Sequence, residues 1–93
     1  GRGMIDVKQI GDGDPMRFEV AVTDRTATRH QVTMSATDFE RLAQGRTPDE
    51  LIDAAFRFLL DREPKESILR SFDVSVIGRY FPEFEHNLPE YLA

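Results

Sequence analysis

The sequence predicts an α+β fold in which a three-stranded antiparallel β-meander is followed by three to four helices packed on one face of the sheet. Hydrophobic residues alternate with polar ones at a period of about two up to Ser35 and of about 3.6 beyond it. The chain has 93 residues, too few for two hydrophobic cores. We therefore expect a single domain over 4–93. Residues 1–3 precede Met4 as a cleaved tag would, and we interpret them as a tag remnant.

Three strands are expected, at 4–10, 16–23 and 29–34. In each of them apolar residues alternate with polar neighbours, as in strands that bury one face. The segments 11–15 and 24–28 between them contain the Gly, Asp, Pro and Thr residues that are typical of hairpin connections. Adjacent strands should therefore be antiparallel. The apolar positions that define the pattern are Ile5, Val7, Phe18, Val20, Val22, Val32 and Met34.

The first helix is expected over 36–44. Ser35 and Asp38 have the spacing of a capping box, which satisfies free amide groups at the start of a helix. Gly45 follows the last apolar residues and can end the helix, because glycine readily adopts the left-handed conformation found there. The expected helix is therefore short.

A longer helix is expected over 48–62. Thr47 can cap it, a proline suits its first position, and Glu50 can reach back to the Thr47 amide. Its polar residues form a single stripe, so the helix is either central to the fold or shared with a second subunit. We favour the central position and hence a monomer. In the homodimer alternative, Phe56 and Leu60 face the second subunit.

Two further helices are expected, at 64–72 and 74–81. Pro64 suits the start of the first and Asp73 can cap the second. A strand over 74–77 is the alternative, but the polar residues there gather on one side only at the helical period. The apolar residues of the remaining tail either close the core or form an interface, and the sequence leaves both open for Phe84, Leu88, Tyr91 and Leu92.

The C-terminal part of the chain contains the runs FLLDREPKESIL (58–69), FDVSVI (72–77) and RYFPEF (79–84). Together these runs resemble a group of short uncharacterised bacterial proteins. The resemblance implies a bacterial, cytoplasmic source. It supplies no activity and no functional residue.

The composition excludes several classes of function. Without cysteine there can be no disulfide framework, thiolate zinc site, iron–sulfur cluster or cysteine nucleophile. A net charge of −5 disfavours nucleic acid and anionic membranes as partners. No apolar run approaches the roughly 20 residues of a membrane span. We therefore expect a soluble cytoplasmic protein.

An enzymatic function is also disfavoured. His30 and His86 are the only histidines, and neither has a catalytic or metal-binding motif around it, so we expect surface or structural roles for both. The segment 12–14 has the first two aspartates of a calcium loop but lacks its other ligands, and we interpret it as a turn. Nucleotide-binding and hydrolase motifs are absent from the sequence. No cofactor or metal is expected.

The favoured function is that of a small protein-interaction or regulatory module. Its candidate interface combines residue types that are enriched at the centres of protein interfaces: Arg79, Tyr80, Phe81, Phe84 and Tyr91. The alternative is a homodimeric nucleic-acid-binding protein that uses the hairpin 25–30 as a β-ribbon. The acidic total charge makes this alternative the weaker one.

Overall fold

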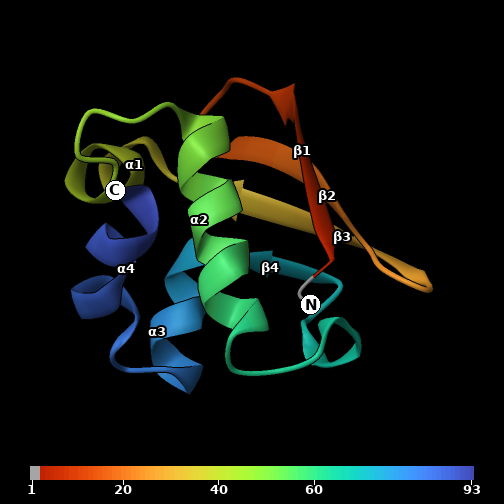
Figure 1. Ribbon diagram of the computed structural model, residues 1–93. Helices are drawn as coiled ribbons and strands as arrows, with labels where there is room; N and C mark the ends of the chain where they lie inside the picture. The colour runs from red at the N-terminus through yellow and green to blue at the C-terminus, as the bar shows by residue number, and fades with distance from the viewer. Residues whose placement is uncertain (1–2) are drawn as a thin grey trace.

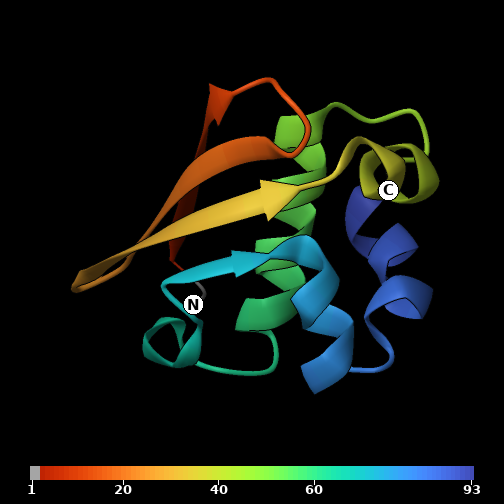
Figure 2. The same ribbon diagram turned by 180° about the vertical axis from the view of Figure 1, so that it is seen from behind.

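In the computed structural model, which describes residues 3–93, one sheet has the strand order β1-β2-β3-β4 (Figure 1). The first three strands form the expected antiparallel meander, and β4 was not expected. It lies parallel to β3, as Figure 2 shows from behind. The interpretation of 1–3 as a tag remnant falls, for the first two residues, outside the described part of the chain. The strands are β1 (Met4–Gly11), β2 (Met16–Thr23), β3 (Ala27–Met34) and β4 (Ser71–Asp73).

The sheet buries one face and leaves the other open. In β2 the residues Phe18, Val20 and Val22 are fully buried, whereas their neighbours are exposed or half-buried. The register places Val20 opposite Val7 of β1, and Phe18 opposite Val32 of β3. Because side chains alternate along each strand, this register brings all the buried side chains to one face, as the sequence pattern predicted.

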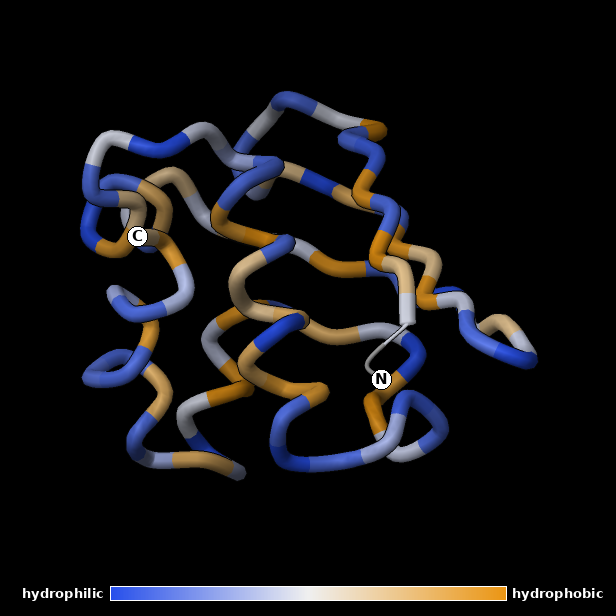
Figure 3. Tube along the Cα trace, viewed as in Figure 1, coloured by the Kyte–Doolittle hydropathy of each residue, from blue (hydrophilic) through white to orange (hydrophobic). Residues whose placement is uncertain are grey.

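Helix α2 (Pro48–Leu60) covers the buried face of the sheet (Figure 1). Its capping box is confirmed: the Glu50 amide donates to Thr47 Oγ1 at 3.2 Å, and the Thr47 amide donates to Glu50 Oε1 at 2.9 Å. Figure 3 shows hydrophobic and hydrophilic residues alternating along the strands and a mostly hydrophilic loop before α2. Phe56 is fully buried in the chain's own core, so it cannot face a second subunit as the homodimer alternative required.

The expected helix over 64–72 is wrong. Only a 3₁₀ turn, η1 (Lys65–Ser67), forms there before the chain becomes extended at Ile68 and enters β4. The open edge of β3 decides this conformation, because the Gln31 amide donates to the Arg70 carbonyl at 2.8 Å. A helix over 64–72 would leave the backbone groups at this edge of β3 without their partners in β4.

The region 74–81 is helical, but it is divided into the 3₁₀ turn η2 (Val74–Val76) and the short helix α3 (Ile77–Tyr80). Asp73 caps it as expected, since its Oδ2 accepts from the Ser75 amide at 3.0 Å. The strand alternative does not form there.

Two other helices pack beside α2. The first, α1 (Ala36–Leu42), is capped by Ser35 as expected and ends two residues earlier than predicted. The second, α4 (Phe84–Leu92), was not predicted, and it packs along α2. Its buried residues show that the C-terminal tail closes the core: Phe84, Leu88 and Leu92. No helix in the described range 3–93 is long and apolar enough to cross a membrane.

Candidate functional site

The structure divides the five candidate interface residues between two places. Arg79 and Tyr80 are exposed on α3, and Tyr80 lines a groove together with the half-buried Phe81. Phe84 is buried at the start of α4, and Tyr91 is half-buried near the end of that helix. The five residues therefore do not form one surface.

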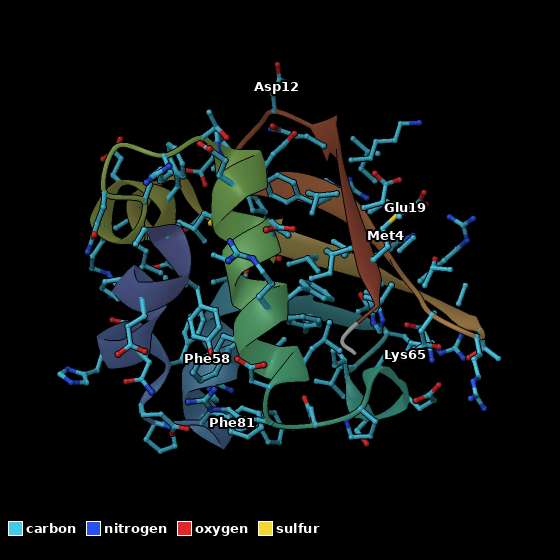
Figure 4. The ribbon with its side chains drawn as sticks, viewed as in Figure 1. Met4, Asp12, Glu19, Phe58, Lys65 and Phe81 are labelled. Carbon is cyan, nitrogen blue, oxygen red and sulfur yellow. The ribbon has the colours of Figure 1, made fainter. Side chains whose placement is uncertain are left out.

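Phe81, Phe84 and Tyr91 instead surround Phe58 of α2. Their ring centroids lie 6.0, 5.0 and 5.9 Å from that of Phe58, each in an edge-on arrangement. The Arg62 guanidinium carbon lies 3.7 Å from the centroid of the same ring. Figure 4 shows Phe58 and Phe81 close together beside α2. We call these five residues the Phe58 cluster, and its role is structural, because it attaches the C-terminal segments to α2.

A groove of about 240 Å³ opens beside the Phe58 cluster, between the end of α2, the segment from η1 to β4, and α3. Two of its residues are unusually exposed for their type, since Leu69 exposes 46% of its surface and Tyr80 exposes 66%. The groove thus has an apolar floor and an apolar, solvent-facing rim. Its apolar walls are Leu59, Ile68, Leu69, Phe72, Ile77 and Phe81.

The backbone at the rim of this groove is held by His30. Its Nδ1 donates to the Leu69 carbonyl at 2.8 Å, which leaves Nε2 to accept from the Thr28 hydroxyl at 2.8 Å. The imidazole is buried and lies 5.4 Å from the Phe56 ring. The structural role expected for His30 is confirmed. Because the hydrogen bond from His30 holds the Leu69 carbonyl, Leu69 keeps a fixed place in the groove.

One acidic side chain lines the groove. Burial raises the pKa of the Glu63 carboxyl above its usual value. Within residues 3–93, no hydrogen-bond donor or cation pairs with this carboxylate. The neighbouring Arg62 is engaged by Glu83 at 2.9 Å. The groove therefore combines apolar walls with an unpaired, partly dehydrated carboxylate, a combination that favours a ligand with an apolar part and a positive charge.

Two other candidates from the sequence, the segment 12–14 and His86, lie on the surface of the fold. The aspartates at 12 and 14 lie in an exposed turn, where Asp14 Oδ1 accepts from the Ala36 amide at 3.0 Å. His86 is exposed on α4. Among the described residues, no group of three or more histidine or acidic side chains could hold a metal ion.

The hairpin proposed for nucleic acid exposes Arg25 and Arg29 as its only basic side chains. Arg29 lies 3.6 Å from Glu19, and His30 is buried. The nearby Lys65 is paired with Asp24 and Glu66, each at 2.8 Å. These acidic neighbours reduce the positive potential that a nucleic-acid backbone requires.

The groove could not be recognised from the sequence, because its lining comes from five elements that only the fold brings together: α2, η1, β4, η2 and α3. Leu69 belongs to the helix expected over 64–72 and Glu63 lies between two expected helices, and nothing in their spacing indicates that they share a groove. Comparison of the chain with family models, with curated proteins and with solved structures finds no match. The resemblance to short bacterial proteins therefore stays a prediction.

Proposed function

We propose that the protein is an interaction module whose groove binds a segment of another protein that carries apolar side chains and one positively charged residue. The observation that carries this proposal is the unpaired Glu63 carboxylate in an apolar groove. A lysine or arginine placed against Glu63 would supply the partner that the fold itself does not.

The exposed rim supports a protein partner. Covering Leu69 and Tyr80 would remove two large side chains from water, and fully burying one such side chain contributes roughly 1.5–3 kcal/mol. The groove holds about 240 Å³, below the roughly 300–1,000 Å³ of typical small-molecule pockets. A few side chains of a peptide suit this space better than a whole small molecule.

The competing functions have less support. The groove carboxylate and the net charge of −5 both repel phosphate groups. For catalysis, a nucleophile and a base would have to lie within hydrogen-bonding distance. The buried histidine already uses both ring nitrogens in contacts with Thr28 and Leu69.

A displayed library of short random peptides tests the proposal without knowledge of the natural partner. We expect the protein to select peptides that combine apolar residues with lysine or arginine. Tyr80→Asp should weaken their binding by about tenfold or more, because it places a charge on the apolar rim. Glu63→Gln should retain apolar peptides and lose the preference for basic ones.

Glu90→Gln is the matched control, since Glu90 is exposed on α4 outside the groove. It should leave the selection unchanged. Selection of acidic peptides, selection that Tyr80→Asp does not affect, or the absence of any selected peptide would contradict the proposal.

A further inference from the structure

Strand β1 offers a long free edge. It is an outer strand of the sheet and contains eight residues, whereas the other outer strand, β4, contains three. In Figure 1 β1 lies at the border of the sheet. The backbone of 5–9 has no hydrogen-bonded partner besides β2 among the described residues. An edge of this kind is a template for pairing with another strand.

We propose that a second copy of this chain pairs with β1 in antiparallel fashion, across a two-fold axis at Val7. A two-fold axis perpendicular to the sheet must pass between two copies of the same residue. Centred at Val7, it places Asp6 opposite Lys8 and Lys8 opposite Asp6. The two sheets then form one continuous sheet with all helices on the same face.

Charge selects this register over its neighbours. Moving the axis to Asp6 would place two Asp6 carboxylates directly opposite each other, and moving it to Lys8 would oppose two ammonium groups. Like charges in directly opposite positions destabilise a sheet, whereas opposite charges stabilise it. Only the axis at Val7 places the two exposed charged residues of β1 opposite side chains of the other sign.

The exposed apolar residues of β1 fit the same register. Met4 is 73% exposed and Ile10 is 49% exposed, which is unusual for such side chains. With the axis at Val7, Met4 of one copy and the bulged Ile10 of the other flank the same end of the paired stretch, on the open side of the sheet. Pairing would therefore cover two of the four large hydrophobic residues that the described chain leaves exposed.

The irregularity in β1 sets the length of the paired segment. The register with β2 shifts between Gln9 and Gly11, which marks a β-bulge at the end of the strand. The stretch 5–9 lies before this bulge and is centred on Val7. A bulge or a lysine commonly protects a lone edge from pairing. In the proposed dimer the bulge lies outside the stretch 5–9, and Lys8 of each copy lies opposite Asp6 of the other.

The inner side of the strand can also accommodate a second copy. Val7 is half-buried and lines a pocket of about 340 Å³ between β1 and α2. The Val7 side chain of the second copy would lie against this pocket. Asp53 and Arg57, on the same wall, are already paired at 2.8 Å, so they present a compensated pair of charges to it.

This dimer differs from the one considered from the sequence, which used α2. It also leaves the groove near Glu63 uncovered, because no residue of β1 lines that groove. Self-association and peptide binding can therefore be tested independently.

Analytical ultracentrifugation of the full chain tests the proposal. Between about 10 µM and 1 mM, a weak dimer should raise the mean mass above the monomer mass of 10.7 kDa. Asp6→Lys should weaken the dimer by about tenfold, because it replaces two attractive pairs with two repulsive ones. Asp6 lies opposite Ala21 within the chain, so no charge pair inside the monomer is lost.

The double variant Asp6→Lys/Lys8→Asp restores opposite charges between the copies in reversed order and should associate more tightly than Asp6→Lys. Its association should stay below that of the parent chain, because position 8 lies opposite Glu19 of β2 within the chain, where an aspartate would be repelled. Glu40→Lys is the control, because it makes the same change in net charge on an exposed position of α1. Circular dichroism verifies that each variant is folded. Amide hydrogen exchange over 5–9 should slow with concentration in the parent chain and not in Asp6→Lys.

A monomer at every concentration would overturn the proposal. So would a dimer that Asp6→Lys leaves as tight as that of the parent chain, because the association would then use another surface. Failure of the reversed pair to recover association in a folded variant would refute the register.

Discussion

Replacing Phe58 by leucine should destabilise the protein more than the same replacement of Phe56. Both side chains belong to α2 and are fully buried. In either variant the smaller side chain loses apolar contact and leaves a small cavity, for which we take a common cost of about 1–2 kcal/mol. The difference between the variants therefore reports on the aromatic neighbours.

The magnitude follows from those neighbours. Phe58 has three edge-on rings around it, at 5.0 to 6.0 Å, and a guanidinium over its face. Phe56 has two tilted neighbours, His30 at 5.4 Å and Phe72 at 6.0 Å. An aromatic pair contributes about 0.5–1.5 kcal/mol beyond its area and a cation–π contact about 0.5–1 kcal/mol. One extra pair and the cation–π contact give a difference of about 1–2.5 kcal/mol.

Urea denaturation followed by circular dichroism measures both free energies of unfolding. In a domain of this length, a difference of about 1–2.5 kcal/mol corresponds to about 4–20 °C in melting temperature. Equal denaturant slopes for the two variants would show that both unfold from equally compact states. Equal losses of unfolding free energy in the two variants, or a larger loss in Phe56→Leu, would refute the energetic role assigned to the Phe58 cluster.

Two further predictions concern the C-terminal tail and Asp73. Truncation after Phe81 removes the buried side chains of α4, so the shortened chain should show no cooperative thermal transition, and a native-like melting curve would contradict the core role of 82–93. Burial raises the pKa of the Asp73 carboxyl, but hydrogen bonds from Thr33 and Ser75 outweigh it and hold the pKa below its usual value. This stabilisation is present above that value and is lost as the pH falls through the folded-state pKa, so Thr33→Val should lower the urea midpoint at pH 7 and have much less effect in strong acid.

The elements that the sequence predicted well have local causes. The strands at 16–23 and 29–34 are predicted by the alternation of apolar and polar residues. Only an extended chain places residues of such a pattern with all apolar side chains on one face. The start of α2 follows from the Thr47 cap, which is satisfied by atoms three residues away. Neither signal needs knowledge of the rest of the fold.

The elements that the sequence missed have distant causes. Three residues of β4 are too few to show a period, and they become a strand because the edge of β3 offers free backbone groups. The signal at Pro64 was sufficient for one 3₁₀ turn but not for a helix. Helix α4 contains Pro89, a residue type that is unfavourable inside a helix, and its packing against α2 outweighs that preference.

By itself the sequence determined the α+β class, the antiparallel meander, the central helix and its cap, because each depends on periodicity or on contacts within a few residues. Only the tertiary structure decided that Phe84 belongs to the core, that Glu63 stands unpaired among apolar side chains, and that β1 keeps a free edge. These three features depend on which distant segments become neighbours. An aromatic or acidic residue has the same local pattern whether the fold covers it, leaves it exposed or places it in a groove.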